Sequence, residues 1–297
     1  MTDTDSGAEA DAPGQRLDDR AVHEAASLLY GLRRSGDTID RLPAEIRPRT
    51  FLDGYRIQDR LIELDGRPVG LVKVGCTTVE TQHIMNLDEP IGGCLPAENV
   101  HQSGATIPLE GFHHPPLVEC EFAMRLAIDI EPDRRFETIE DVKAVNDALA
   151  PALELVDGRY RSQLGIDGPS VVADNSMATA VVVGPAVEFV PGFCPVEPGS
   201  VMVRLVAASA DGGGEESIAE GLGANVLGDP WRSLHWALRH LANRHRSIAA
   251  GTWVITGSCS GAPAAPLDRR LTAHFDGMGA VTVSIAATET GAAGDGS

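Results

Sequence analysis

Two glutamates, Glu119 and Glu121, stand two residues apart in the segment VECEFAMRLAIDI at 118–130, where every even-numbered residue is apolar. This period of two predicts a β-strand that points both glutamates out of the same face. Like charges this close raise each other's pKa unless a cation lies between them. The pair therefore marks either a solvated sheet face, which is the ordinary case, or part of a cation site.

Three more charged residues interrupt apolar segments of the strand type. Lys73 lies in GLVKVG, Glu154 in PALELV and Asp174 in VVADNS. Charged side chains are almost never fully buried without a partner, so these residues and the glutamate pair indicate one polar centre shared by several strands. Oxygen ligands without histidine or cysteine favour a hard cation, Mg²⁺ or Mn²⁺. Three carboxylates around one divalent ion leave a negative charge, so an anionic substrate would need Lys73 or Arg159 nearby.

The elements that must position these residues follow from periodicity and caps. Helices are expected at 21–36, 50–64, 137–151 and 229–244, the third capped by Thr138 and stopped by Pro151, and the fourth capped by Asp229 with Pro230 next. Strands are expected at 68–76, 118–130, 152–156, 170–174, 178–184, 251–257 and 279–287, with a hairpin at 200–221. Many short strands and few helices predict an α+β fold with mixed or antiparallel pairing rather than a doubly wound sheet.

Composition limits the partners and the location. The 297 residues carry a net charge of -19, which would repel nucleic acid and anionic membranes. We find no apolar run of the roughly 18 residues needed to span a bilayer, and the acidic segment 1–20 lacks the apolar core of a signal peptide. We therefore expect a cytoplasmic protein with a disordered tail at 1–20 and a flexible tail at 289–297. The five cysteines include no C-x-x-C pair, which disfavours a disulfide framework or structural zinc.

Two other patterns have plainer interpretations. GSCSG at 257–261 resembles a nucleophile elbow around Cys259, but such an elbow needs a following helix, which Pro263 and Pro266 prevent. The alternative is that the turn beginning at Thr256 and running through Ser258 presents backbone N–H groups to an anion. His113 and His114 lie in a proline-rich turn, where we expect them to be solvated.

The segments VECE, PALELVDGRY, VVADNS, LGANVLGDP and GTWVITG occur in this order over 21–287. With them, the chain resembles the hydratase/decarboxylase branch of the fumarylacetoacetate hydrolase superfamily. The resemblance implies a mixed, barrel-like β-roll at 81–288 preceded by a helical and strand part at 21–80, in a homo-oligomer. It also implies a divalent metal at Glu119, Glu121 and Glu154. Further implied site residues are Lys73 and Asp174 as catalytic groups, and Asn175, Arg159, Thr256, Gly257 and Ser258 around the substrate.

The implied chemistry is that of a lyase acting on an unsaturated 2-oxo acid through an enolate or dienolate, by decarboxylation or hydration. Ile91 stands where hydratases carry an aspartate, which favours decarboxylation. Gly92 lacks an expected aromatic side chain, and Leu117 replaces a basic residue that would help to hold a second carboxylate. Two alternatives stay open: a C–C bond hydrolase, whose general base would be His23 or Glu24, and a non-catalytic member that acts as a structural or regulatory partner.

Overall fold

The structure is a computed structural model that describes residues 16–162, 165–190, 192, 196–208 and 214–286. The tail expected at 289–297, most of the tail expected at 1–20, and Cys194 lie outside the described residues. The helices are α1 (Asp19–Ser35), α2 (Phe51–Asp65), α3 (Val79–Ile84), α4 (Ile139–Lys143), α5 (Gly168–Ala173) and α6 (Pro230–Asn243).

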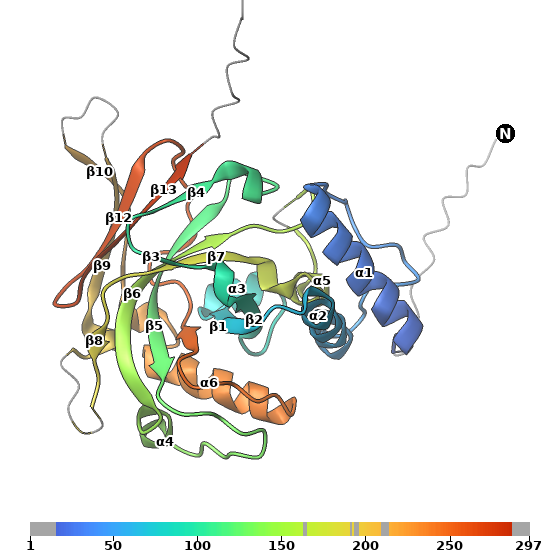
Figure 1. Ribbon diagram of the computed structural model, residues 1–297, viewed down its shortest axis with the longest axis horizontal. Coiled ribbons are helices and arrows are strands. Elements are labelled where there is room, and N and C mark those ends of the chain that lie inside the picture. Colours follow the sequence, from blue (N-terminus) through green and yellow to red (C-terminus); the bar gives the residue numbers. More distant parts are fainter. Residues whose placement is uncertain (1–15, 163–164, 191, 193–195, 209–213, 287–297) are drawn as a thin grey trace, which may run out of the picture.

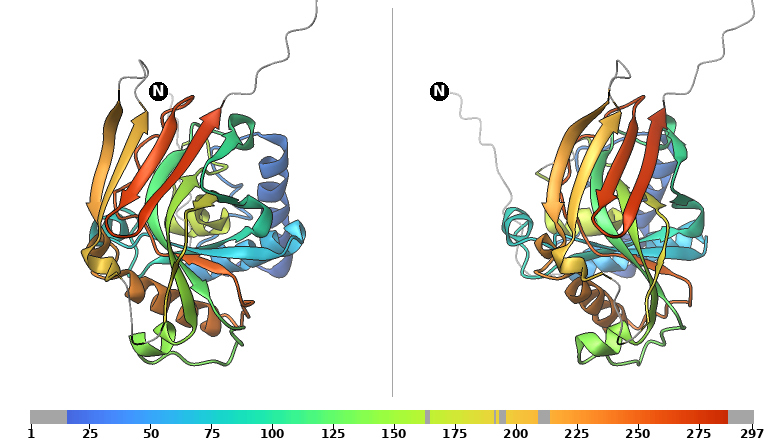
Figure 2. Two further views of the ribbon diagram at one scale, coloured as in Figure 1. Left: turned by 60° about the vertical axis from the view of Figure 1, so that its left-hand side comes forward. Right: turned by 90° about the vertical axis from the view of Figure 1, so that its left-hand side faces the viewer.

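Two sheets form the body of the molecule. The larger has the strand order β2-β1-β11-β5-β6-β7-β3, with β8 also paired to β6, and the smaller has the order β10-β9-β12-β13-β4. The strands are β1 (Val69–Gly75), β2 (Ile91–Pro96), β3 (Val100–Gln102), β4 (Ala105–Pro108), β5 (Leu117–Leu126), β6 (Asn146–Val156), β7 (Ala178–Val183), β8 (Val187–Glu188), β9 (Met202–Ala208), β10 (Glu215–Leu222), β11 (Trp253–Ile255), β12 (Arg270–Phe275) and β13 (Gly279–Ala286). The smaller sheet forms a separate layer beside the long strands β5 and β6 (Figure 2).

Alternation along β5 sorts its side chains between two interiors. Cys120, Phe122 and Met124 enter the main core between the sheets and α6. Ala123, on the opposite face, packs with Ala150 and Ala152 of β6 in a second cluster. Because both faces are covered, the face that carries Glu119 and Glu121 is not a solvated sheet surface.

Several expected elements are confirmed. The N-caps Thr138, with Asp141, and Asp229 are formed, and the hairpin pairs β9 with β10. The buried face of α6 contains Leu234, Ala237, Leu238 and Leu241, as its helical spacing predicts.

Two expected elements are wrong. The helix expected at 137–151 ends at Lys143, and Pro151 lies inside β6 instead of ending a helix. From Asn146 on, the chain pairs with β5 on one side and with β8 and then β7 on the other, and this buried pairing selects an extended backbone over the local helical pattern. The strand expected at 170–174 is the short helix α5, capped by Asp167 with a proline in its first turn.

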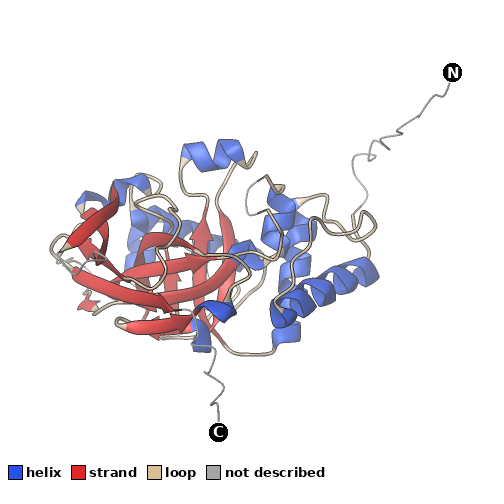
Figure 3. Cartoon of the chain, turned by 90° about the horizontal axis from the view of Figure 1, so that it is seen from above, coloured by secondary structure: helices blue, strands red, loops and turns tan. Residues whose placement is uncertain are grey.

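The helices α1 and α2 lie to one side of the sheets (Figures 1 and 3). They pack on each other around a cluster that includes Leu29, Ile57 and Tyr160. This packing begins before residue 21, because Leu17 is 8% exposed and the Asp18 side chain caps α1. Among the described residues, we find no helix long and apolar enough to cross a membrane.

Candidate metal and substrate site

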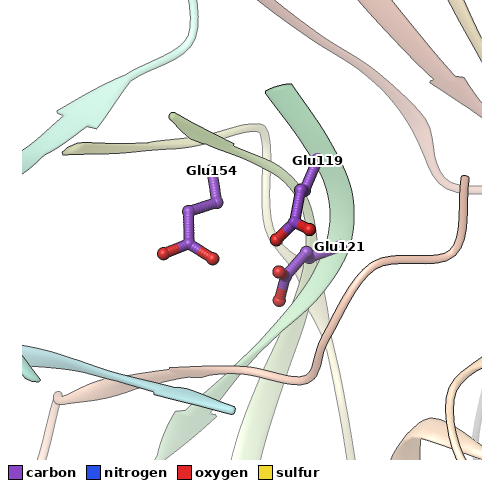
Figure 4. A group of neighbouring side chains, drawn as sticks. All are labelled: Glu119, Glu121 and Glu154. Carbon is purple, nitrogen blue, oxygen red and sulfur yellow. The ribbon is translucent and has the colours of Figure 1, made fainter. Parts of the chain in front are cut away.

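Three glutamates from two neighbouring strands point toward one another (Figure 4). Glu119 of β5 is directly opposite Glu154 of β6 in the antiparallel register, and Glu121 is two residues further along β5. One carboxylate oxygen of each lies within 4.8 Å of those of the other two. Glu121 and Glu154 have no exposed surface. The period-two pattern of β5 and its register with β6 therefore gather three carboxylates on one face, two of them fully buried.

Lys73 of β1 completes this group. Its Nζ lies 3.1 Å from Glu154 Oε1 and donates to the Ser176 carbonyl at 3.0 Å. Burial alone would lower the pKa of Lys73, but the charges of Glu154, Glu119 and Glu121 outweigh burial and raise it. The side chain is therefore an ammonium that offsets one of the three negative charges.

The three carboxylates carry more negative charge than Lys73 neutralises. Burial and the charge of Glu154 raise the pKa of Glu119 to about 7, and burial with both neighbouring carboxylates raises that of Glu121 well above its usual range. Among the described residues, Glu154 Oε2 and Glu121 Oε1 have no hydrogen-bond donor. Buried carboxylate oxygens without donors, close enough to share one ion, fit a divalent cation.

A turn after β11, with a glycine at a positive φ angle, supports the site. The Gly257 N–H donates to Glu121 Oε2 at 2.6 Å, and Gly257 has φ +104. A Cβ there would lie 2.3 Å from the hydroxyl oxygen of Thr77, so the position has no room for a side chain. Among the described residues, the buried hydroxyl of the preceding Thr256 has no hydrogen-bond partner. The neighbouring Ser258 hydroxyl donates to the Gly261 carbonyl at 2.6 Å and so stabilises the turn.

The structure brings Asp174 and Arg159 together with each other. The Arg159 guanidinium donates to Asp174 Oδ1, and the Arg159 backbone N–H donates to Asp174 Oδ2 at 2.8 Å. The side chain of Asn175 makes two hydrogen bonds with the backbone of Cys94. Its Nδ2 donates to the Cys94 carbonyl at 2.6 Å, and its Oδ1 accepts the Cys94 N–H at 3.0 Å. Through these contacts, Arg159, Asp174 and Asn175 help to hold the segment whose Ser176 carbonyl accepts the hydrogen bond from Lys73.

The segment at 175–177 is a feature that the sequence did not reveal. Asn175, Ser176 and Met177 all have left-handed φ angles, of 55, 53 and 60 degrees. Left-handed φ angles cost energy in non-glycine residues and persist only where surrounding contacts enforce them. Here the Ser176 hydroxyl donates to the Gly92 carbonyl at 2.7 Å, which fixes the segment against β2.

Ile91 and the ammonium of Lys73 both lie close to Gly75. A Cβ built on Gly75 would be 3.5 Å from Ile91 Cγ1 and 3.7 Å from Lys73 Nζ, so the two groups flank the same point. Ile91 packs with Val171 and Val172 in an apolar cluster. Gly92 has no side chain, and the ring of His240 from α6 lies next to its backbone. A Cβ added at Gly92 would lie 3.6 Å from this ring.

The alternative sites are not assembled. Cys259 is buried and followed by an irregular segment rather than a helix, and burial raises the pKa of its thiol well above the usual value. His23 accepts a hydrogen bond from Arg60 at 3.0 Å, and Glu24 pairs with Arg20, both on the exposed side of α1. The expectation that His113 and His114 are solvated is wrong, because both contact the buried Asp157.

A mixed β-roll that encloses three carboxylates and one ammonium has the character of an enzyme that works with a divalent cation. Relatives agree with this class, although no family model matches the chain. The chain is 30% identical over 262 residues to a 2-keto-4-pentenoate hydratase of Paraburkholderia xenovorans, covering 87% of this chain and 92% of that one. It is 31% identical over 238 residues to a 4-oxalocrotonate decarboxylase of Pseudomonas putida, covering 78% and 84%.

Solved structures give the same picture. The 4-oxalocrotonate decarboxylase of Pseudomonas putida G7, complexed with magnesium and adipate, superposes with a TM-score of 0.81 at 25% identity, covering 92% of this chain and all of that one. A fumarylpyruvate hydrolase of Pseudomonas aeruginosa shares the fold at a TM-score of 0.51. The chain belongs to the hydratase/decarboxylase branch of the fumarylacetoacetate hydrolase superfamily.

Proposed function

We propose that the protein is a divalent-metal-dependent lyase that acts on an unsaturated 2-oxo acid, with Glu119, Glu121 and Glu154 as the metal ligands. The observation that carries the proposal is the buried convergence of these carboxylates beside Lys73. The relatives that cover most of the chain are a hydratase and a decarboxylase of such acids. When bound, Mg²⁺ or Mn²⁺ supplies Lewis acidity toward the carboxylate and 2-oxo oxygens of the substrate.

Lys73 is proposed as the group that moves a proton. An ammonium has three N–H donors. Two face Glu154 and Ser176, which leaves the third for a substrate, as far as the described residues go. Because Lys73 is only 4% exposed, bulk water is excluded and its charge acts strongly on a substrate that gains negative charge at its 2-oxo oxygen.

Decarboxylation is the proposed reaction, and Ile91 is the reason. In a 2-oxo-3-enedioate, the bond to the distal carboxylate breaks, CO₂ leaves, and the electron pair passes into the conjugated 2-oxo system. An apolar side chain near this carbon favours loss of the carboxylate, because CO₂ needs less solvation than the anion. A hydratase would need a polar group to position water, and Ile91 with Val171 and Val172 supplies none.

Hydration remains the second candidate because of the 30% identical hydratase relative. Leu117 is uncharged and so cannot hold a second carboxylate of the substrate. This favours a substrate with a single carboxylate, as in hydration. The two reactions are separated by supplying 2-oxohex-3-enedioate and 2-hydroxypenta-2,4-dienoate separately with Mg²⁺, and by following conjugated absorbance and released CO₂. CO₂ release from the diacid supports decarboxylation. Water addition to the dienoate without CO₂ release would overturn that choice.

We also propose an oligomeric state and a location for the protein. A cytoplasmic homo-oligomer is expected from the family resemblance and from the composition. Light scattering after gel filtration measures the number of copies, and a monomer at micromolar concentration would contradict the expectation.

A further inference from the structure

A second charged cluster lies outside the proposed metal site. The buried carboxylate of Asp157 accepts the His113 backbone N–H at 2.7 Å, and its oxygens lie 3.1 Å from His113 Nδ1 and 2.8 Å from His114 Nδ1. Burial would raise the pKa of Asp157, but the hydrogen bonds from His113 and His114 outweigh burial and lower it. Asp157 is therefore ionised and acts as an acceptor for both rings.

The ring of His113 is held between two acceptors. Its Nδ1 faces the Asp157 carboxylate, and its Nε2 lies 3.1 Å from the Leu32 carbonyl in the last turn of α1. A neutral imidazole has one N–H, so either tautomer would point a lone pair at an oxygen. The doubly protonated ring donates to both oxygens. The hydrogen bond to Asp157 raises the pKa of His113 against its burial, and the Leu32 carbonyl adds to the increase.

Other charges face this ring from neighbouring elements. Arg159, which is paired with Asp174, lowers the pKa of His113, but not enough to cancel the effect of Asp157. His114 shares the Asp157 carboxylate through Nδ1 alone among the described residues. The neutral form of His114 can make that single contact by carrying its proton on Nδ1, whereas both contacts of His113 need two protons.

The cluster joins the two strands that carry the glutamates. His113 lies in the turn before β5, and Asp157 directly follows the last residue of β6. Glu119 and Glu154 face each other close to these same ends. The contact from His113 to Leu32 ties α1 to the same point.

We propose that doubly protonated His113 is a positioning residue that holds the ends of β5 and β6 where Glu119 and Glu154 can share one divalent cation. The proposal rests on the assignment of these glutamates as metal ligands. A neutral ring loses one of the two contacts. The support that His113 gives to metal binding is therefore largest at low pH and declines as the ring loses its second proton.

The test compares the full-length wild type with His113→Gln, His114→Gln and Asp157→Asn by Mg²⁺ titration calorimetry. The wild type should bind about fivefold more tightly than His113→Gln near about pH 6, and this ratio should shrink toward about pH 9. Titration of the glutamates themselves is common to both proteins and cancels in the ratio. His114→Gln is the matched control, and its effect should be the same at both pH values. Asp157→Asn should weaken binding at both.

A second measurement needs no variant. In wild-type protein with ¹⁵N-labelled histidine, both ring nitrogens of His113 should carry protons at about pH 6.5, where half of an unperturbed histidine is neutral. A neutral His113 there, or a ratio of affinities that does not change with pH, would overturn the proposal. Wild-type protein that binds neither Mg²⁺ nor Mn²⁺ would overturn the ligand assignment and this proposal together, while a bound metal without lyase activity would contradict only the proposed reaction.

Discussion

The ammonium nitrogen of Lys73 lies 3.1 Å from Glu154 Oε1, although β11 and β5 separate their strands in the sheet. Three strand spacings amount to about 14 Å in a flat sheet. The contact therefore requires two long side chains and a curved sheet that brings β1 and β6 toward each other. Curvature is what turns four charged residues on three strands into one site.

The first prediction concerns metal binding. Replacing Glu119 or Glu154 by Gln should weaken Mg²⁺ or Mn²⁺ binding by at least about tenfold. Each variant replaces a charged carboxylate ligand by a neutral amide, which has only one oxygen. Titration calorimetry and thermal unfolding with and without a chelator measure the effect. Glu188→Gln is the control, since Glu188 is exposed on β8 beside β6. Unchanged metal affinity in Glu154→Gln would remove Glu154 from the ligand set.

The second prediction separates catalysis from metal binding. Lys73→Met should lower kcat by at least about 10²-fold, the lower range for a general acid–base group, while a metal is still bound. Lys143, the other lysine of the chain, lies over the Trp231 ring, and Lys143→Met serves as the control for loss of a lysine charge. Near-normal turnover in Lys73→Met would leave Lys73 as a structural ion-pair partner of Glu154.

The third prediction separates two effects of a substitution at Gly257, namely the collision with Thr77 and the strain of a positive φ angle. Gly257→Ala should lower the free energy of unfolding and weaken metal binding, because the new methyl group collides with Thr77 and displaces the N–H that donates to Glu121. Gly261 has φ +76 with no atom within 4 Å of its Cβ position. Gly261→Ala should therefore cost only about 1 to 2 kcal/mol of backbone strain. Equal losses in denaturant titrations would exclude the steric explanation.

The fourth prediction defines the N-terminal boundary. Deleting residues 1–15, which are acidic and poor in apolar side chains, should leave the unfolding temperature unchanged. Deleting residues 1–20 should lower it, because that change also removes the buried Leu17, its hydrogen bond to Asp53 at 3.2 Å, and the Asp18 cap of α1. A cap alone contributes about 1 kcal/mol. Calorimetry of both truncated proteins measures the difference, and equal unfolding temperatures would contradict it.

The fifth prediction concerns pH and uses metal-free protein. The pKa of His113 is raised in the folded state, so its contribution to stability is complete below the unfolded value of about 6.5 and is lost as pH rises through the folded value. The wild type should therefore exceed His113→Gln in unfolding free energy at about pH 6, and the difference should narrow at higher pH. Urea titrations across this range measure it, and a difference that grows with pH would have the wrong sign.

The sequence by itself determined the chemical identity of the site. Glu119 and Glu121 share a face because side chains alternate along a strand, and Lys73 and Glu154 stand out because charged residues in apolar segments need partners. The pattern of strands and helices predicted the α+β class, and the resemblance supplied the β-roll architecture and the proposed role of Glu154 as a metal ligand. Local patterns failed where burial overrides propensity: Pro151 ends no helix, because its segment is extended between two strands.

Only the tertiary structure decided which charges meet. The sequence leads us to expect Arg159 and Asp174 at the site as separate functional groups. In the structure they pair with each other, because the segments that carry them fold onto one another. His113 gave no sequence signal, since its two acceptors come from Leu32 and Asp157, which are far from it in the chain. Long-range contacts of this kind depend on how strands curve and helices dock, and residue types and spacing along the chain do not encode them locally.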